Sequence, residues 1–308
     1  MSKQKHHFNR IIDLPKTASS KHLFRPFLNI LFKEHPALKE LEVSFPPNQG
    51  KNSAVVFIGP YVFKAARNDD RHQIPAFKRE MDLHDKLERH AKDAGFDVPR
   101  ITHRSEEYLY FGMEKKTGTP LRSEDYAALP IEEQARIANF LGTYIASLHA
   151  ALSPHIPDAN PSEPWFDTDP DIHHNNLHHR QVSARLTIEG LYDFAQKKVQ
   201  NFADQAAEIG QARILFHGDL GPQNILYDSN AKTITPIDYG LTRYCSPEEA
   251  AWFALRCYGP AFLTHLTTAF NASSQSPLNP DHVILIDTVS ALNKMKNLYR
   301  DLDGLDDK

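Results

Sequence analysis

The chain is poor in cysteine, has no long apolar run and carries little excess charge, and each absence excludes a class of protein. Its 308 residues include two cysteines, Cys245 and Cys257, too few for a disulfide scaffold at this length. No apolar stretch approaches the roughly 20 residues that cross a bilayer, and the N-terminal segment has no apolar signal core. We therefore expect buried free thiols, no membrane partner and a cytoplasmic location.

The charge balance and composition narrow the class further. The formal net charge is -4, which is not the basic footprint of a protein that binds a nucleic-acid backbone, so no nucleic-acid partner is expected. A hydrophobic fraction of 41% with 24% charged residues is typical of an ordinary folded protein. The length exceeds one compact core and suits two lobes.

Hydrophobic patterning predicts a small α+β lobe over residues 1–115. Within the first forty residues, the apolar positions have helical spacing and indicate a short amphipathic helix. The runs that follow are rich in Val, Ile, Phe and Tyr, and two of them are joined by the turn dipeptide Gly59-Pro60. We predict strands near 41–45, 54–58, 61–65, 100–103 and 108–113, and a helix over 75–93.

Residues 116–308 are predicted to form a second, mostly helical lobe. Helical periodicity is strong over 131–152 and returns over 183–209, 247–270 and 281–302. Between the first two helices lies an insertion, residues 153–180, rich in Pro, Asp, Asn and His. Three short apolar strands are predicted at 214–216, 225–227 and 234–237, beside the polar segments that carry the clearest functional pattern.

That pattern is HGDLGPQN followed by IDYG, and it has the residue types that phosphoryl transfer needs. A carboxylate after a strand, Asp219, can orient an attacking hydroxyl, while the amide oxygen of Asn224 and the carboxylate of Asp238 can bind magnesium. His217 is interpreted as a residue that braces the loop. The alternative is a polar hairpin loop that contains these residues by coincidence. Both halves occur in order, each beside an apolar strand, which favours the catalytic interpretation.

The first lobe holds a candidate ion pair that could place a positive charge at the phosphates of a nucleotide. Lys64 lies in the strand YVFKAAR among apolar neighbours, and a buried ammonium requires a partner. Glu80, on the following helix, is the predicted partner, with Asp82 or Glu88 as alternatives if the helix register differs. The other interpretation is a lysine on an edge strand that points to solvent. The order of the motifs favours the pair.

HGDLGPQNILYD with IDYG resembles the catalytic and metal-binding segments of the aminoglycoside phosphotransferases. Their superfamily includes choline, homoserine and fructosamine kinases and shares the protein-kinase fold. The resemblance implies two lobes with a nucleoside triphosphate, ATP or GTP, between them. It also implies Asp219 as catalytic base, Asn224 and Asp238 as Mg²⁺ ligands, and Lys64 with Glu80 at the phosphates.

Two further segments fit this resemblance, with one departure. YLYFGMEKKTGTPL resembles the family's hinge, which implies contacts of the purine with backbone groups of Glu114 and Lys116. No GxGxxG occurs; PPNQGKNS stands at its place, and Ser53 matches a serine often found there in the family. The missing glycines, together with Gly218 where protein kinases have arginine, favour a small-molecule kinase over a protein kinase.

Two clusters leave alternatives open. The segment DPDIHHNNLHHRQ has His pairs with helical spacing, which can supply two metal ligands on one helix face. No cysteine cluster completes such a site, so a polar loop is the favoured interpretation. Separately, several acidic residues could form a wall for a polycationic substrate, although a solvated loop is the simpler interpretation. They are Asp158, Asp167, Asp169, Asp171, Glu248 and Glu249.

The sequence thus predicts a phosphotransferase that moves the γ-phosphate of ATP or GTP to a hydroxyl of a small molecule. An aminoglycoside-like amino sugar is the first choice of acceptor. A metabolic alcohol, such as a choline-, homoserine- or sugar-like molecule, is the alternative. A protein-targeting kinase and a nucleotide-binding pseudoenzyme are less favoured. The choice of nucleotide, the oligomeric state and the physiological role stay open.

Overall fold

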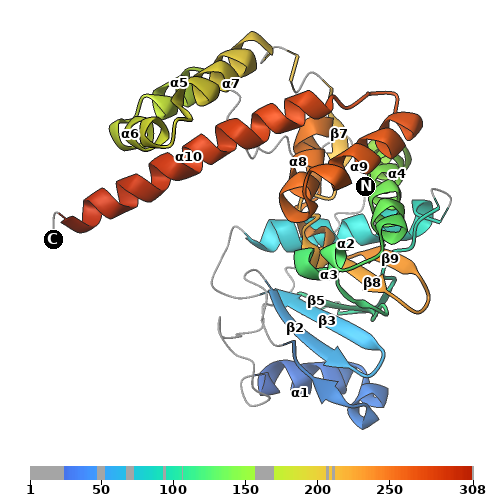
Figure 1. Ribbon diagram of the computed structural model, residues 1–308. Helices are drawn as coiled ribbons and strands as arrows, with labels where there is room; N and C mark the ends of the chain where they lie inside the picture. The colour runs from blue at the N-terminus through green and yellow to red at the C-terminus, as the bar shows by residue number, and fades with distance from the viewer. Residues whose placement is uncertain are drawn as a thin grey trace, which may run out of the picture. The chain divides into compact units, whose positions relative to one another are not determined.

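The computed structural model divides the chain into two compact units (Figure 1). The first unit contains residues 1–119 and 226–241, and the second contains residues 120–225 and 242–308. The structure describes residues 24–46, 53–66, 73–92, 95–105, 107–156, 170–205, 208–209 and 212–306.

The first unit is built on a five-stranded antiparallel sheet with the order β1-β2-β3-β5-β4. Its strands are β1 (Val43–Ser44), β2 (Ser53–Ile58), β3 (Tyr61–Ala66), β4 (Ile101–Arg104) and β5 (Tyr110–Glu114). The β2–β3 hairpin turns at Gly59-Pro60, where Gly59 has φ +53. This order places β3 at the centre of the sheet, so the interpretation of Lys64 as an edge-strand lysine is wrong.

Two helices cover opposite faces of this sheet because side chains alternate along its strands. Helix α1 (Arg25–Glu34) and the short helix η1 (Pro36–Glu40) share a core with Phe63 and Ala65 of β3. Helix α2 (Gln73–His90) packs on the other face, where its Phe77 and Met81 meet Phe111. In Figure 1, α1 and α2 lie on the two sides of the strands.

A smaller three-stranded sheet, in the order β6-β8-β9, leads to the IDYG segment. It consists of β6 (Thr119–Pro120), β8 (Ile225–Asp228) and β9 (Thr233–Pro236), and is followed by the short helix η4 (Tyr239–Leu241), which packs against α2. Gly118, just before β6, has φ +104, and a Cβ there would lie 2.8 Å from the Tyr227 carbonyl. Only glycine allows this close approach of two backbones.

The second unit is mostly helical, as predicted. Its centre is the pair α4 (Ile131–Leu152) and α9 (Pro260–Ser273), which approach closely at Gly142, where a Cβ would lie 2.3 Å from the Leu266 carbonyl oxygen. A two-stranded antiparallel sheet joins β7 (Ile214–Phe216) to β10 (Arg243–Cys245). The other helices are α3 (Ser123–Ala127), η2 (Ser153–His155), α5 (Pro170–Leu177), α6 (Arg180–Ile188), α7 (Tyr192–Gln205), η3 (Pro222–Asn224), α8 (Pro247–Tyr258) and α10 (Pro280–Asp306).

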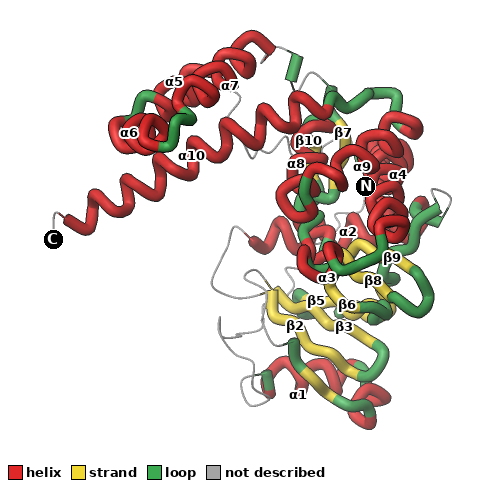
Figure 2. Tube along the Cα trace, viewed as in Figure 1, coloured by secondary structure: helices red, strands yellow, loops and turns green. Residues whose placement is uncertain are grey.

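Three helix assignments differ from the prediction (Figure 2). The helix predicted over 247–270 is broken at Gly259, which has φ +87. Pro260 follows it and has no N–H to donate to a carbonyl of the preceding turn, so a new helix begins there. The helix predicted over 183–209 is divided at Gly190, which has φ +70. The end of the polar insertion is helix α5. Packing of α5 against α7 and α10 supplies the stability that its polar sequence does not indicate.

No helix in the described ranges has a stretch both apolar enough and long enough to span a bilayer. Cys245 is buried and Cys257 is partly buried, and both are free thiols. Burial raises the pKa of each thiol, so neither is an activated nucleophile.

Candidate active site

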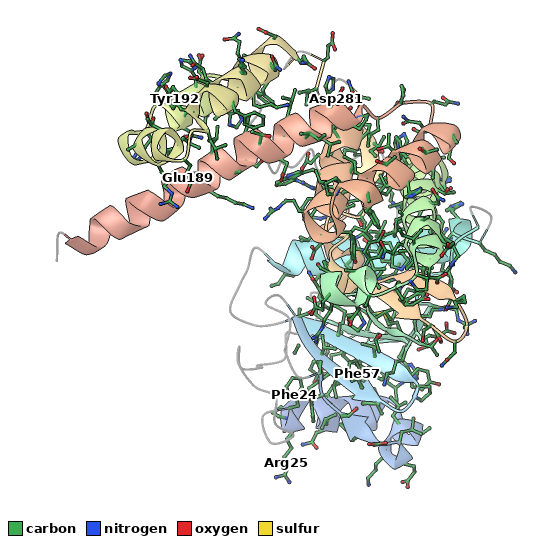
Figure 3. The ribbon with its side chains drawn as sticks, in the orientation of Figure 1. Phe24, Arg25, Phe57, Glu189, Tyr192 and Asp281 are labelled. Atoms are coloured by element: carbon green, nitrogen blue, oxygen red, sulfur yellow. The ribbon has the colours of Figure 1, made fainter. Side chains whose placement is uncertain are left out.

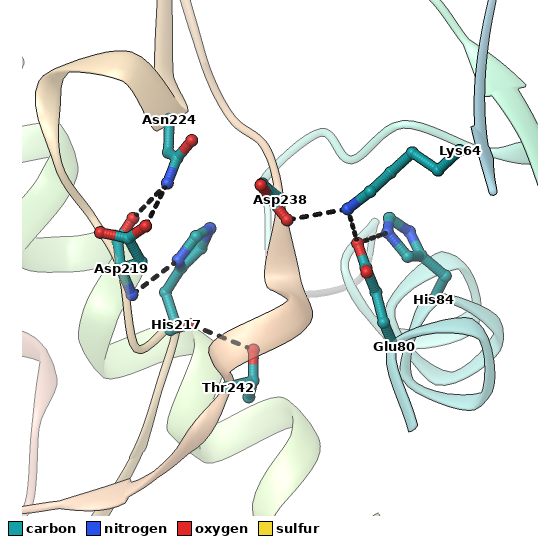
Figure 4. Close-up of polar contacts among 8 residues, drawn as sticks. All are labelled: Lys64, Glu80, His84, His217, Asp219, Asn224, Asp238 and Thr242. Carbon is teal, nitrogen blue, oxygen red and sulfur yellow. Dashed lines mark hydrogen bonds and ion pairs between the residues drawn. The ribbon is translucent and has the colours of Figure 1, made fainter. Parts of the chain in front are cut away.

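Lys64 lies on the face of β3 that α2 covers, because its neighbours Phe63 and Ala65 point into the core on the α1 side. Its side chain is only 7% exposed. The ammonium donates to Glu80 Oε1 at 2.5 Å and to Asp238 Oδ1 at 2.9 Å (Figure 4). The predicted contact between Lys64 and Glu80 is therefore present, and a second carboxylate joins it.

Burial and the neighbouring charges together set the pKa values of Lys64 and Glu80. Burial disfavours the ammonium, but the two carboxylates outweigh this effect and raise the pKa of Lys64. Burial also raises the pKa of Glu80, an effect that Lys64 opposes and Asp238 reinforces. With all three groups ionised, one positive charge meets two negative charges. The excess negative charge suits a divalent cation.

His84 supports the cluster from the next turn of α2, and the sequence analysis missed it. Its Nε2 atom lies 4.0 Å from Glu80 Oε1, and its ring meets the edge of Tyr239 at a centroid distance of 5.6 Å. Burial, aided by Lys64, lowers the pKa of His84 to about 3. The imidazole is therefore neutral at ordinary pH and does not compete with Lys64 for the ion pair with Glu80. His84 follows Glu80 by four residues, a spacing that places two helix residues side by side and could have indicated this contact from the sequence.

Three residues of IDYG have local features that bear on their type. Asp238 has φ +66, a left-handed conformation that few non-glycine residues adopt, and its side chain is 51% exposed. The buried Tyr239 holds the turn by donating its hydroxyl to the Pro236 carbonyl at 3.3 Å. A Cβ on Gly240 would lie 3.1 Å from Glu80 Oε2. Backbone strain at Asp238 is typical of residues held in place for function.

Asp219 and Asn224 form the corresponding cluster in the second unit. The Asn224 side-chain amide donates to Asp219 Oδ2 at 2.9 Å and to the Asp219 carbonyl at 2.8 Å. Only the NH₂ group of asparagine can donate, so these bonds assign its nitrogen to Asp219 and leave its oxygen to act as acceptor or ligand. The short helix η3, which begins at Pro222 after the N-cap Gly221, carries Asn224 back to Asp219.

His217 is buried and braces the loop, as its interpretation proposed. Its Nδ1 accepts from the Asp219 N–H at 3.4 Å, and its carbonyl accepts from Thr242 Oγ1 at 3.3 Å (Figure 4). Gly218, with φ +86, lets the chain turn between His217 and Asp219. These contacts orient the Asp219 backbone. Because His217 is fully buried, its ring has no exposed face for proton transfer with solvent.

The oxygen types at Asn224 and Asp238 fit Mg²⁺, which prefers oxygen ligands and is commonly held by one or two protein groups with waters and phosphates. In the part of the chain that the structure describes, no three His, Cys, Asp or Glu side chains gather to hold a metal ion. A metal held by these two side chains would need further ligands from a substrate or water. The two residues belong to different units, and their joint role stays a prediction.

The remaining predicted nucleotide contacts lie in the first unit. Ser53 begins β2 opposite Ala66 and is 8% exposed. Glu114 ends β5, where its backbone N–H donates to the Arg100 carbonyl at 2.9 Å. The Lys116 ammonium lies 2.7 Å from an Asp97 carboxylate oxygen. The roles of these three residues stay predictions.

The acidic wall, the less favoured alternative for these residues, cannot include two of its six candidates. Glu248 and Glu249 lie buried in the first turn of α8, where negative charge is favourable. Glu249 pairs with Arg243, and its backbone N–H is capped by Ser246 Oγ at 3.1 Å. Asp171 is exposed on α5. The other three, Asp158, Asp167 and Asp169, lie outside the described residues.

Comparison with known proteins gives a family and a fold. A model of the family described as "Phosphotransferase enzyme family" matches residues 45–280. By sequence, no curated protein matches the chain. Several solved structures resemble it at low identity, which makes them evidence for the fold.

One such structure is the GDP complex of wild-type aminoglycoside 2'-phosphotransferase-IIIa, with 17% identity and a TM-score of 0.66, covering 91% of this chain and 92% of that one. Another is the GDP and kanamycin complex of APH(2")-IIIa, with 18% identity, a TM-score of 0.64 and coverage of 91% and 93%. The apoenzyme of macrolide 2'-phosphotransferase MphH from Brachybacterium faecium has 17% identity, a TM-score of 0.55 and coverage of 90% and 93%.

Proposed function

The chain belongs to the phosphotransferase enzyme family and has its two-lobed, protein-kinase-like α+β fold, and on this basis we propose that it transfers the γ-phosphate of ATP or GTP to a hydroxyl of a small molecule. The N-terminal lobe, residues 1–115, would bind the nucleotide. The C-terminal lobe, residues 116–308, would supply the catalytic base and the acceptor site. The reaction would take place in the cytoplasm, where free thiols such as those of Cys245 and Cys257 stay reduced.

The observation that carries this proposal is the buried Lys64, bonded to both Glu80 and Asp238. A lysine at a sheet centre that pairs with a helix carboxylate is the arrangement that kinases use to place a positive charge at the nucleotide phosphates. Asp238 would release Lys64 in part when phosphates and a metal bind. A structural ion pair would not need a half-exposed carboxylate on a residue whose backbone is held at φ +66, as at Asp238.

Asp219 would accept the hydrogen bond of the acceptor hydroxyl and orient its oxygen toward the γ-phosphorus. Phosphoryl transfer depends chiefly on the positions of the reacting groups and on the charges around them. An aspartate whose backbone and side chain are both held by hydrogen bonds is well suited to this role. The Asn224 amide donates a hydrogen bond to the Asp219 carboxylate, and His217 accepts one from the Asp219 backbone N–H. The proton of the hydroxyl would pass to Asp219 as the new oxygen–phosphorus bond forms and the bond from the γ-phosphorus to the β–γ bridging oxygen breaks, which releases ADP or GDP.

Asn224 and Asp238 would hold Mg²⁺ through their side-chain oxygens. Bound Mg²⁺ offsets the negative charge of the nucleotide phosphates. The protein's own contribution is the placement of these two oxygens, by η3 in one case and by the turn after β9 in the other.

The purine would meet the backbone at Glu114 and Lys116. Because the Glu114 N–H is bonded to Arg100, we assign the carbonyl of Glu114 and the backbone of Lys116 to the base. Ser53, at the start of β2, would contact the phosphates from the loop that replaces a glycine-rich segment. Backbone recognition of this kind serves adenine and guanine, so either nucleotide is a candidate.

An amino sugar of the aminoglycoside class is the first candidate acceptor. Structural neighbours include an aminoglycoside phosphotransferase complex with kanamycin and another with streptomycin, the latter with 17% identity and a TM-score of 0.58. Neighbours also include macrolide phosphotransferases. A metabolic alcohol of the choline, homoserine or sugar type is the alternative, since Glu248 and Glu249 do not offer an acidic wall to a polycation.

The proposal is tested first on the nucleotide. Purified protein is heated with ATP or GTP, with and without Mg²⁺, and the unfolding temperature is expected to rise with a purine triphosphate and Mg²⁺. Absence of a shift with every purine triphosphate would sink the proposal. Acceptors are then screened by nucleotide consumption, with aminoglycosides, macrolides and metabolic alcohols as separate sets. Phosphorylation of an alcohol set alone would replace the amino-sugar assignment.

A further inference from the structure

The histidine pair His174 and His178 lies outside the residues assigned to phosphoryl transfer, at the end of helix α5. The pair has the spacing of one helical turn, and the helical hydrogen bond from the His178 N–H to the His174 carbonyl, 3.1 Å, continues α5 to His178. Both side chains are exposed. Their Nε2 atoms face each other at 3.2 Å.

We propose that His174 and His178 form a two-histidine site for a divalent transition-metal ion of the Zn²⁺ type. Two nitrogens that bind one ion at about 2.0–2.1 Å stand roughly 3 Å apart when they occupy neighbouring positions around it. The 3.2 Å between the two Nε2 atoms matches this separation. Imidazole nitrogens suit Zn²⁺, Ni²⁺ and Cu²⁺, whereas Mg²⁺ prefers oxygen.

Tyr192, labelled in Figure 3 at the start of α7, contacts one of the two rings. Its hydroxyl lies 3.1 Å from His178 Nδ1. A metal-binding histidine commonly donates its second ring N–H to an oxygen, which sets the tautomer and the ring orientation. With Nδ1–H donated to Tyr192, His178 presents the lone pair of Nε2 to the metal position. The contact between the two histidines is then replaced by two bonds to one ion.

The opposite face of α5 holds the pair in place. His173, Asn176 and Leu177 are buried, and the His173 ring meets Phe202 of α7 at a centroid distance of 4.9 Å. The backbone that carries the two ligands is therefore anchored before any metal arrives, which reduces the entropy lost on binding. Among the described residues no third His, Cys, Asp or Glu completes the cluster, so the site is proposed with these two histidines as its protein ligands.

The test uses the untagged full chain and Ni²⁺, without nucleotide, in an equilibrium titration near neutral pH. Wild-type protein is expected to bind Ni²⁺ at this site. His174→Ala and His178→Ala are each expected to weaken that binding at least tenfold, and Tyr192→Phe to weaken it by about tenfold. The control is His265→Ala, an exposed histidine of α9 whose neighbours one turn away are Ala261 and Ala269. It should leave the affinity unchanged.

Equal affinities of wild-type protein and the double variant His174→Ala/His178→Ala would overturn the proposal, as would a wild-type chain that binds no Ni²⁺. A second measurement needs no variant. Ni²⁺ broadens the NMR signals of the rings that bind it, so the signals of His174 and His178 should broaden first. Broadening of other histidines, with these two unaffected, would also exclude the site. Mg²⁺ at the same concentration should cause no broadening of either ring.

Discussion

A single residue, Lys64, illustrates how a charge is tolerated in the centre of a sheet. Because side chains alternate along a strand, Phe63 and Ala65 point into the core shared with α1, and Lys64 points to the opposite face, under α2. Two carboxylates meet it there, at 2.5 Å and 2.9 Å. The ammonium is buried only because these partners replace the water that it loses.

Removing that ammonium should destabilise the fold as well as abolish activity. Lys64→Met leaves Glu80 buried without its cation, and breaking a buried pair in this way costs about 3–5 kcal/mol. We expect the free energy of unfolding, measured by chemical denaturation, to fall by about 3 kcal/mol. The double variant Lys64→Met/Glu80→Leu should recover part of this loss. The exposed Arg79→Met on the same helix is the control, with a change within about 0.5 kcal/mol.

Asp219→Asn should separate catalysis from binding and stability. The substitution keeps the size of the side chain but removes the carboxylate, so transfer is expected to slow by about 10²–10⁴-fold, the contribution typical of a positioned acid or base. The thermal shift caused by Mg²⁺ and nucleotide should stay near the wild-type value. A variant that retains wild-type kcat would show that Asp219 is not the base.

His84 gives the fold a specific sensitivity to acid. The folded-state pKa is lowered to about 3 from the ordinary value of 6.5. Below pH 6.5 the unfolded chain therefore binds a proton that the folded chain does not, and stability is lost as the pH falls toward 3. For one proton the slope is at most about 1.4 kcal/mol per pH unit.

His84→Gln, which cannot titrate, should flatten the pH dependence of the free energy of unfolding. The comparison is made between pH 6.5 and 4, where the folded imidazole stays neutral while the unfolded chain takes up the proton. Parallel curves for wild type and variant would contradict a neutral buried imidazole.

At the scale of elements, the second unit depends on the close approach of α4 and α9 at Gly142. A Cβ at that position would lie 2.3 Å from the Leu266 carbonyl oxygen and 3.0 Å from the Phe270 backbone nitrogen. Backbone atoms cannot move aside as a flexible side chain can. The absence of a side chain at Gly142 therefore sets the distance between these two helices.

Gly142→Ala should consequently be destabilising, although alanine is the better helix former by about 1 kcal/mol. The clash with α9 is expected to outweigh this gain and to reduce the free energy of unfolding by about 1–3 kcal/mol, the usual range for overpacking. Thr143→Ala, exposed on the same turn, is the matched control. If Gly142→Ala raises the unfolding temperature, the helices are not held at this distance by Gly142.

At the scale of the whole molecule, the residues assigned to phosphoryl transfer are distributed over both units. Lys64, Glu80 and Asp238 belong to the first unit, and Asp219 and Asn224 to the second. The family match spans residues 45–280 and so includes both sets. Under the proposed function, neither unit by itself would contain all the groups that the reaction uses.

Magnesium removal should therefore affect activity and nucleotide-linked stability together. A chelator such as EDTA is expected to abolish transfer and to reduce the thermal shift with ATP or GTP. Under saturating conditions, at about 100 times the dissociation constant, a bound ligand adds about 2.7 kcal/mol. Asp238→Ala should reproduce the effect of the chelator on the shift. Full activity in EDTA would exclude the assigned metal role of Asn224 and Asp238.

The sequence alone indicated, from local patterns, many of the elements and the kind of chemistry of this chain. Helix α4 was predicted at its observed bounds, Ile131–Leu152, because 22 residues of apolar periodicity are a strong local signal. The strands beside Asp219 and Asp238 were also predicted, since short runs of Ile, Leu and Phe next to polar motifs are visible in the chain itself. The motif order HGDLGPQN then IDYG indicated the family.

The tertiary structure decided which charged residues meet and which are withdrawn. Packing buried Glu248 and Glu249 under Arg243 and the start of α10, so they cannot serve as an exposed acidic wall. It added Asp238 and His84 to the Lys64–Glu80 pair, and it turned the end of a polar insertion into helix α5. These outcomes depend on contacts between residues far apart in the chain, and burial of that kind leaves no periodicity in the sequence.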